Sequence, residues 1–285
     1  MELQSLRTFQ AVVEEGGILS ASRRLNTVQS NVTARIKRLE AEIGANLFYR
    51  KGRGLELAPS GRVLLEYARK ILQLETQAGM AVRQVGEETG ELRIGAMETF
   101  TALHLPRALK RLHLAYPGLK LKVETNTSSD LVEMVLEHRL DCAFVGGPVE
   151  HSEIVAREII EEELLLIRSR HGTLETLPLI LFREGCAYRA RALSWQRESG
   201  HQEGGIMEFG TLDGILGCVA VGLGCTLMPR WVLEISRYRQ ELVSDPIPAH
   251  LAYVPTMMVW HRNTLPLKAL DTLREFVMAE DAKKT

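Results

Sequence analysis

The chain has 285 residues, which is enough for roughly two domains at about 150 residues each. Hydrophobic residues make up 45% of it and charged residues 25%, a globular composition that excludes a disordered chain, and four cysteines are too few for a disulfide scaffold. No run of about 18 apolar residues is present, and the N-terminus lacks the pattern of a secretion signal. We therefore expect a cytoplasmic protein without a membrane partner, whose cysteines are reduced.

The net charge of −1 hides an uneven distribution along the chain. Residues 1–62 contain ten Lys and Arg residues and six acidic residues, so their net charge is +4. The remainder contains 25 basic and 30 acidic residues, so its net charge is −5. A basic N-terminal part on an acidic body indicates a module that binds a polyanion, joined to a second function.

Three short helices are predicted at the N-terminus. Residues 4–13, 18–25 and 29–43 each place apolar side chains at helical spacing. Gly16-Gly17 ends the first helix, and the polar pair Asn26-Thr27 forms a tight turn before the third. Three helices with such a turn between the second and the third predict a helix-turn-helix.

A wing and a long helix are predicted next. Residues 47–57 form the two-stranded wing, because apolar residues bracket a tip rich in glycine and arginine. Pro59 stands at a favoured first position for the helix over residues 60–85. Apolar residues recur every seven positions there, which fits either an amphipathic helix packed on its own domain or a dimer seam; we favour the seam because the helix is long. The expected seam residues are Leu64, Tyr67, Ile71, Leu74 and Ala78.

Beyond a linker at residues 86–90, predicted strands alternate with predicted helices. This alternation is typical of a mainly parallel α/β architecture, either as one large domain or as two lobes. The strands are expected at 91–96, 119–124, 140–145, 163–168, 177–182, 206–209, 224–227 and 257–260, and the helices at 105–116, 129–138, 187–198, 212–221 and 265–279.

The third N-terminal helix carries a polar face once its apolar stripe is assigned to the core. Gln and Asn side chains can pair with adenine edges and Arg with guanine, while Ser, Thr and Lys suit phosphates. A solvated polar face is the alternative, but arginines on the neighbouring wing favour DNA. The expected DNA-binding residues are Thr27, Gln29, Ser30, Asn31, Thr33, Arg35, Lys37, Arg38, Arg50 and Arg53.

These features together carry a family resemblance. Residues 1–75 resemble the winged helix-turn-helix and linker helix of LysR-type transcriptional regulators, and the rest of the chain is similar to the effector domain of that family. The matching residues in the first part include Leu6, Phe9, Ala21, Leu25, Gln29, Val32, Ile36, Leu39-Glu40, Leu47-Phe48, Leu57, Gly61 and Ala68-Arg69-Lys70-Ile71-Leu72. Those in the second part include Gly95, Leu105-Pro106, Tyr116-Pro117, Leu140-Asp141, Gly146-Gly147-Pro148, Gly222-Leu223-Gly224 and Met228-Pro229.

The resemblance implies an α/β protein with an all-α N-terminal part. A winged helix-turn-helix domain is expected at residues 1–58 and a linker helix with a hinge at 59–90. An effector-binding domain similar to periplasmic solute-binding proteins is expected at 91–285, with lobe I at 91–162 and 256–285 and lobe II at 163–255. The implied function is sequence-specific regulation of transcription, switched by a small molecule. The implied partners are double-stranded promoter DNA, the small-molecule effector, further copies of the chain in a dimer or homotetramer, and RNA polymerase.

Three positions depart from the family pattern, of which Ser22 in place of a usual Ala is a mild change. Val28 stands where the family commonly has Ser or Thr, so we expect Thr27 to cap the third helix instead. Ala58 stands where a Thr usually caps the linker helix, so the start of that helix is expected to rely on Pro59 and water.

Candidate effector contacts follow the predicted strand ends, where ligands of open α/β sheets bind. Arg183, Tyr188 and Arg189 would suit a carboxylate, because arginine binds carboxylates bidentately. Glu98 and Glu208 would suit an amine, so both groups together would suit an amino acid or a derivative. The alternative is that these charges are solvated or paired with each other. The expected effector contacts are Glu98, Thr99, Thr127, Ser128, Gly147, Arg183, Cys186, Tyr188, Arg189, Glu208 and Thr211, of which Thr99 and Ser128 match common ligand positions of the family.

Two other functions stay open at this point. Cys186 lies near a predicted helix start with Arg183 and Arg189 close by, which would lower its thiol pKa and suit a redox-sensing transcription factor. A solute-binding protein would fit residues 91–285 but not the basic N-terminus. No enzyme, cofactor or metal is expected, because Walker A, G-x-S-x-G and H-E-x-x-H motifs are absent and Gly222-Leu223-Gly224 is a lone G-x-G.

Overall fold

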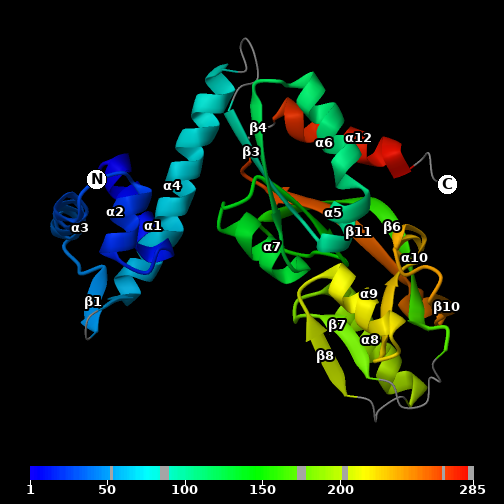
Figure 1. Ribbon diagram of the computed structural model, residues 1–285. Coiled ribbons are helices and arrows are strands. Elements are labelled where there is room, and N and C mark those ends of the chain that lie inside the picture. Colours follow the sequence, from blue (N-terminus) through cyan, green and yellow to red (C-terminus); the bar gives the residue numbers. More distant parts are fainter. Residues whose placement is uncertain (52–53, 84–89, 172–177, 201–204, 265–266, 282–285) are drawn as a thin grey trace. The chain divides into compact units, whose positions relative to one another are not determined.

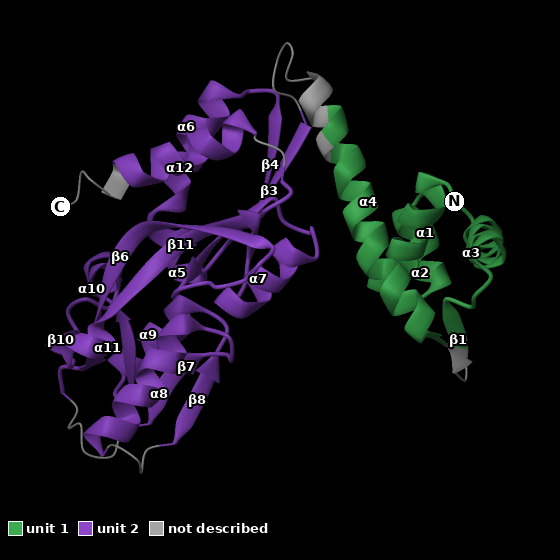
Figure 2. Cartoon of the chain, turned by 180° about the vertical axis from the view of Figure 1, so that it is seen from behind, with its two compact units in different colours: residues 1–85 green, residues 86–285 purple. Residues whose placement is uncertain are grey.

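The computed structural model describes residues 1–51, 54–83, 90–171, 178–200, 205–264 and 267–281 (Figure 1). The chain divides into two compact units, unit 1 at residues 1–85 and unit 2 at residues 86–285 (Figure 2). Each unit has its own hydrophobic core. No helix in the described ranges combines the length and the apolar character that a membrane span requires.

Unit 1 is a three-helix domain with a two-stranded wing and a long following helix (Figure 1). Its core gathers apolar side chains that recur at helical spacing, and Phe9 packs on Phe48 of the wing with ring centroids 5.4 Å apart. Gly44 ends the third helix in the left-handed conformation, with φ at 75°. The elements are α1 (Leu3–Glu14), α2 (Ile18–Arg24), α3 (Gln29–Ile43), β1 (Phe48–Lys51), β2 (Gly54–Leu57) and α4 (Pro59–Arg83).

The start of α3 differs from the prediction. Val28 is the N-cap residue, and no side chain caps the helix there. The hydroxyl of Thr27 instead accepts a hydrogen bond from the Asn31 side chain at 3.1 Å, so the expected capping role of Thr27 is wrong. At the start of α4, Ala58 is fully buried and the Ser60 hydroxyl donates to the carbonyl of Asn46. Packing and this side-chain bond therefore hold the start of α4.

The first half of unit 2 is a parallel sheet with strand order β4-β3-β5. Helices join these strands, as the alternating pattern predicts, and α6 packs against the C-terminal helix α12 (Figure 1). The strand ends of this sheet are the places where the candidate effector contacts were expected. The elements are β3 (Gly90–Ala96), α5 (Glu98–Leu103), α6 (Leu105–Ala115), β4 (Leu119–Thr125), α7 (Ser128–Leu136), β5 (Cys142–Gly146) and α12 (Lys268–Asp281).

Two long antiparallel strands, β6 (Ile154–Ser169) and β11 (Tyr253–His261), link the two halves of unit 2. Residues 154–163 of β6 pair with β11, with one irregularity in the register, and residues 164–168 pair with β9. The sequence predicted only residues 163–168 of β6 and only 257–260 of β11. Side chains on these two strands are therefore shared by both lobes.

The second half of unit 2 adds a second parallel group of strands, β9-β7-β8, while β10 pairs antiparallel with β6. The unit is thus an α/β structure with two lobes on a mixed sheet, which confirms the predicted fold class. Strand β10 and helices α5, α10 and α11 were not predicted. The elements are β7 (Leu179–Phe182), α8 (Ala187–Ser199), β8 (Ile206–Phe209), α9 (Leu212–Ala220), β9 (Cys225–Pro229), α10 (Arg230–Ile235), β10 (Leu242–Pro246) and α11 (Ala249–Ala252).

Candidate functional site

Helix α3 turns one face to the core and one to solvent. Val32, Ile36 and Leu39 are buried against the other helices of unit 1. The polar residues predicted to bind DNA lie on the remaining surface of the helix and at its start. Gln29, Ser30, Asn31, Lys37 and Arg38 are exposed, and Thr27, Thr33 and Arg35 are partly exposed.

Several of these polar groups already have partners within unit 1. Arg38 pairs with Glu2 at 2.7 Å and with Glu42 at 3.2 Å, so part of its charge is neutralised. The Thr33 hydroxyl donates to the carbonyl of Gln29 at 2.9 Å. Strands β1 and β2 form the predicted wing, but Arg53 and the side chain of Arg50 lie outside the described residues.

The expected seam on α4 divides into two sets. Leu64 and Ile71 are partly buried and pack against the core of unit 1. Tyr67 and Leu74 are 57% and 60% exposed, and Ala78 is exposed as well. Three of the five seam residues thus form an exposed stripe, while the other two pack against the core of unit 1.

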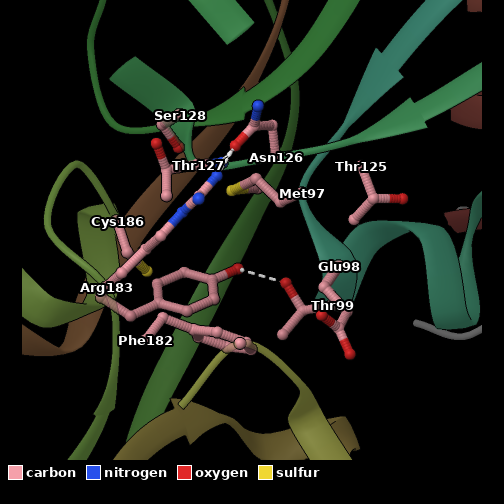
Figure 3. A pocket seen from close by; sticks show the side chains of 12 residues that line it. Met97, Glu98, Thr99, Thr125, Asn126, Thr127, Ser128, Phe182, Arg183 and Cys186 are labelled. Atoms are coloured by element: carbon pink, nitrogen blue, oxygen red, sulfur yellow. Dashed lines mark hydrogen bonds between the residues drawn. The ribbon is translucent and has the colours of Figure 1, made fainter. Parts of the chain in front are cut away.

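Unit 2 contains a cavity of about 230 Å³ between its lobes (Figure 3). Four segments that follow strands line it: the one after β3, the one after β4, the one at the end of β7, and the residue after β8. Because parallel strands end at the same edge of a sheet, residues far apart in sequence meet here. The lining residues are Met97, Glu98, Thr99, Thr125, Asn126, Thr127, Ser128, Phe182, Arg183, Cys186, Tyr188 and Gly210.

A close approach between the lobes closes one side of this cavity. The Ser129 amide donates to the carbonyl of Gly185 at 3.2 Å, and Thr127 caps α7 by accepting from the Asp130 amide at 3.3 Å. Gly185 has φ at 89°, and a Cβ there would lie 2.7 Å from the hydroxyl oxygen of Thr127. Only glycine therefore fits the loop that brings Arg183 and Cys186 to the cavity.

The charged residues of the cavity make contacts across the cleft. Arg183 of lobe II donates to Asn126 of lobe I (Figure 3). It also pairs with Asp130 of lobe I at 3.0 Å. Glu98 of lobe I accepts a hydrogen bond at 2.7 Å from the amide of Leu212, the first residue of α9. The carboxylate thus lies at a helix N-terminus, where the helix dipole favours negative charge. These contacts join the lobes around the cavity.

Tyr188 connects the cavity to a buried carboxylate. The Thr99 hydroxyl donates to the Tyr188 phenol at 3.4 Å, which is the dashed line that ends on Thr99 in Figure 3. The phenol donates to Glu162 of β6 at 2.5 Å. Burial raises the pKa of Tyr188 well above its ordinary value, and the negative charge of Glu162 adds to the effect. The phenol therefore keeps its proton.

Four of the expected effector contacts do not line this cavity. Arg189 and Glu208 pair with each other at 2.9 Å, which is the alternative considered from the sequence. Thr211 caps α9 by accepting from the Gly214 amide at 3.2 Å, and Gly147 turns the chain with φ at 87°. These four residues therefore form an ion pair, a helix cap and a turn within unit 2.

Two residues at this site were missed by the sequence reasoning. Phe182, the last residue of β7, lines the cavity. Glu162 does not line it, but it lies behind Tyr188 and is only 4% exposed. The strand is predicted to begin at residue 163, so the prediction places Glu162 at the boundary between the two lobes and outside the strand. An extended strand that includes the acidic run 161–163 is the signal that would have located it.

The expected activation of the Cys186 thiol is wrong. Burial raises its pKa, and this effect outweighs the lowering by backbone amides of Arg189 and Tyr188 and by the charge of Arg189. The guanidinium of Arg183 is engaged with Asn126 and Asp130 instead. At neutral pH a smaller fraction of this thiol is therefore ionised than in an ordinary cysteine. Among the described residues no cluster of three His, Cys, Asp or Glu side chains could hold a metal ion.

Comparisons with known proteins decide the family. Residues 3–62 match the model for the "Bacterial regulatory helix-turn-helix protein, lysR family", and residues 86–282 match the "LysR substrate binding domain". The chain belongs to the LysR family of transcriptional regulators. It is thus a DNA-binding regulator with an effector-binding domain, and its relatives are named as regulators, not as enzymes.

Relatives of this LysR-family chain match it over almost their whole length. The HTH-type transcriptional regulator GltR of Bacillus subtilis is 36% identical over 277 residues, which are 95% of this chain and 94% of GltR. The HTH-type transcriptional regulator SoxR of an Arthrobacter species is 36% identical over 281 residues, with 97% and 96% of the two chains covered.

Solved structures share the fold of this LysR-family chain. Full-length OxyR from Pseudomonas aeruginosa superposes with a TM-score of 0.72 at 20% identity, over 97% of this chain and 94% of OxyR. CbnR in complex with its target DNA superposes with a TM-score of 0.67 at 24% identity, over 98% and 99% of the two chains. At these identities the likeness describes the fold.

Proposed function

We propose that this chain binds promoter DNA sequence-specifically as a dimer and alters that complex when a small molecule occupies the cavity of unit 2. The observation that carries the proposal is the combination, in one chain, of an exposed polar face on helix α3 and a cavity between two lobes that polar and charged residues help to line. DNA reading is assigned to residues 1–58, pairing to 59–90 and effector binding to 91–285. A regulator of promoters acts in the cytoplasm, where the bacterial chromosome lies, and RNA polymerase is its downstream partner.

Helix α3 is the proposed reader of the major groove. Gln29 at its exposed N-terminal end suits an adenine edge, because its amide can donate and accept at once. Further along the helix, Lys37 suits a phosphate and Arg35 suits a guanine edge. Arg50 and Arg53 on the wing suit an adjacent minor groove or its backbone. Arg38 contributes less, since Glu2 and Glu42 share its charge.

A direct test recovers and sequences the fragments of the source genome that the purified protein retains. Variants are then compared on a recovered site. Gln29→Ala should lose about 1–3 kcal/mol of discrimination between bases. Lys37→Ala should weaken binding to all sequences and reduce the salt slope by about 1. Arg274→Ala on α12 is the matched control for a lost cation. Unchanged affinity and specificity in both α3 variants would exclude this docking.

Helix α4 is the proposed dimer contact, through the exposed stripe of Tyr67, Leu74 and Ala78. A two-fold dimer would place two α3 helices on half-sites one helical turn, or a few turns, apart. Pairs of dimers would form the homotetramer. Leu74→Glu should shift the protein toward monomers in analytical ultracentrifugation, whereas Glu66→Gln on the same helix should not. A dimer that persists in Leu74→Glu would remove α4 from the interface.

The cavity is the proposed effector site, and an amino acid, another amine or a carboxylate is the proposed effector class. Glu98, Thr99, Thr127, Ser128, Arg183 and Tyr188 supply both negative and positive charge and several hydroxyl groups. An effector shifts the regulator only if it binds two arrangements of the chain unequally. The contacts of Arg183 and Glu98 across the cleft are groups that such a ligand would rearrange.

The cavity is tested by filling it. Ser128→Phe places an aromatic ring where the ligand would lie. In a strain with a reporter gene under the recovered promoter, this variant should lose the response to the metabolites of the growth medium, while the purified variant still binds the promoter. Val221→Phe, at a position 75% exposed, is the control for an added ring. A retained response in Ser128→Phe would exclude the cavity as the effector site.

A further inference from the structure

A buried carboxylate lies behind the wall of the cavity. Glu162 of β6 is 4% exposed and does not line the cavity itself. Its Oε2 atom accepts hydrogen bonds from the Tyr188 phenol at 2.5 Å and from the Thr256 hydroxyl at 2.9 Å, and its Oε1 atom accepts from the Trp231 indole at 2.9 Å. Glu162 is thus an acceptor for three neutral donors that come from α8, β11 and α10.

A carboxylate at this place costs free energy that an amide would not. Moving a charge out of water is unfavourable, and hydrogen bonds offset only part of that cost. Glutamine has the same size as glutamate and could also accept from the Trp231 indole. The carboxylate differs from an amide in one respect that matters here: both of its oxygens accept hydrogen bonds and neither donates one.

The direction of the hydrogen bonds follows from that difference. A phenol has one proton, and Tyr188 gives its proton to Glu162. On its cavity side Tyr188 can therefore only accept. The group that it accepts from is the Thr99 hydroxyl, at 3.4 Å, a long contact beyond the usual range for two hydroxyl groups. A ligand with a better donor can replace Thr99 at the phenol oxygen.

We propose that Glu162 determines which effector the cavity selects, although it does not touch the ligand. By holding the proton of Tyr188, it makes the Thr99 end of the cavity an acceptor for a donor group of the effector. Glu98 lines the same cavity with a carboxylate, so the fitting donor is a protonated amine. This inference rests on the proposed function, because it needs an effector in this cavity.

The opposite end of the cavity has the opposite polarity. The Ser128 hydroxyl oxygen accepts from the Gly146 amide at 3.0 Å, so its own proton is directed to another acceptor. Ser128 is also the first residue of α7, where the helix dipole favours negative charge. The cavity is therefore built for a molecule with an amine at one end and a carboxylate at the other, namely an amino acid or a derivative that keeps both groups.

The test reverses the hydrogen bond of Tyr188 without changing the size of its partner. In Glu162→Gln the amide oxygen can stay with Trp231, and the amide nitrogen then donates to Tyr188. The phenol proton must turn toward Thr99 and the cavity. The cavity would then present a donor where the native protein presents an acceptor.

The probes are matched pairs of an amino acid and the corresponding 2-oxo acid: L-glutamate with 2-oxoglutarate, L-alanine with pyruvate, and L-phenylalanine with phenylpyruvate. Binding to the full-length protein is measured by calorimetry. The native chain should bind at least one amino acid at least tenfold more tightly than its 2-oxo partner. Glu162→Gln should lower this ratio at least tenfold, chiefly through weaker binding of the amine.

Two controls separate selection from a merely structural effect. Thr256→Val removes one donor from Glu162 but leaves Oε2 to accept from Tyr188, so both members of a pair should lose affinity together and keep their ratio. Glu163→Gln removes the charge of the next residue, which pairs with Arg230, and should leave the ratio unchanged. A ratio that falls equally in Thr256→Val would overturn the specific role of Glu162.

An infrared measurement reports the hydrogen bond without any ligand. The C–O stretch of Tyr188 is isolated, in each background, as the difference from the matching Tyr188→Phe variant. It should shift in Glu162→Gln, because the phenol then donates toward Thr99 and the cavity instead of to a carboxylate. An unchanged band, an unchanged ratio, or tighter binding of the 2-oxo acid by the native chain would each overturn the inference. Failure of the proposed effector site would instead appear as a retained metabolite response in Ser128→Phe.

Discussion

The two units of this chain present their proposed binding groups in different ways. In unit 1 the groups proposed to meet DNA come mainly from one helix, α3, within a few turns. In unit 2 the cavity gathers side chains from four segments between residues 97 and 210, placed on two lobes. The period of one helix sets the first surface, whereas the register and packing of a mixed sheet set the second. A substitution should therefore act locally in unit 1 and across the lobes in unit 2.

The largest expected effect tests whether the units are independent. Phe9→Ala removes a fully buried ring that packs on Phe48, and it should lower the free energy of unfolding of unit 1 by about 3–5 kcal/mol. Calorimetric unfolding of the full chain should show one transition moving while that of unit 2 stays. Leu19→Ala, at a position 48% exposed, is the control and should change little. Equal shifts of both transitions would contradict independent units.

A smaller effect is expected where the two lobes approach each other. Gly185→Ala forces a side chain into a left-handed backbone and against the Thr127 hydroxyl, so unit 2 should lose about 1–3 kcal/mol of stability. Gly210→Ala is the matched control, because no atom lies within 4 Å of its added Cβ and its φ is ordinary. Urea unfolding of both variants measures the difference. Equal stability of the two variants would mean that the loop around Gly185 accommodates the added methyl group without strain.

The buried phenol gives unit 2 a dependence on alkaline pH that unit 1 should lack. Because the pKa of Tyr188 is raised in the folded state, the unfolded chain loses this proton first, near the ordinary tyrosine pKa of about 10. The stability of unit 2 should be intact below that pH and fall above it by up to about 1.4 kcal/mol per pH unit. Tyr188→Phe should remove this part of the slope. An identical slope in the variant would exclude the assignment.

The smallest effect is expected at the ion pair across the cleft. Arg183 and Asp130 are 53% and 44% exposed at their side chains, and exposed pairs contribute little. Arg183→Gln should therefore change the unfolding free energy of unit 2 by about 1 kcal/mol or less in urea. A loss of several kcal/mol would mean that this pair holds the lobes together.

Much of the fold could be predicted because it follows from local patterns. The periods of α1, α3 and α4 and the alternation of strands and helices in unit 2 identified most elements within a few residues. The missed elements are those with weak local signals. The first half of β6 carries charged residues on its exposed side, and α10 and α11 have only six and four residues.

The site was predicted less completely for the same reason. Strand ends identified Thr99, Ser128 and Tyr188 as cleft residues, since chain order alone shows where a strand stops. Arg189 and Glu208 looked equally suitable, but they pair with each other on neighbouring segments. Cys186 looked activated by nearby arginines, yet its burial decides the direction of its pKa. Partner choice and burial depend on contacts between distant segments.

The sequence by itself determined the architecture, the polar face of α3 and the strand ends that surround the cavity, because each follows from residue type and spacing along one element. The tertiary structure alone decided which of these side chains line the cavity and which are paired with one another. Glu162 illustrates the difference: it is one acid in an acidic run until β6, α8, α10 and β11 pack around it and deliver three donors to its carboxylate. A hydrogen bond needs two partners at a fixed distance, and only the folded chain sets that distance.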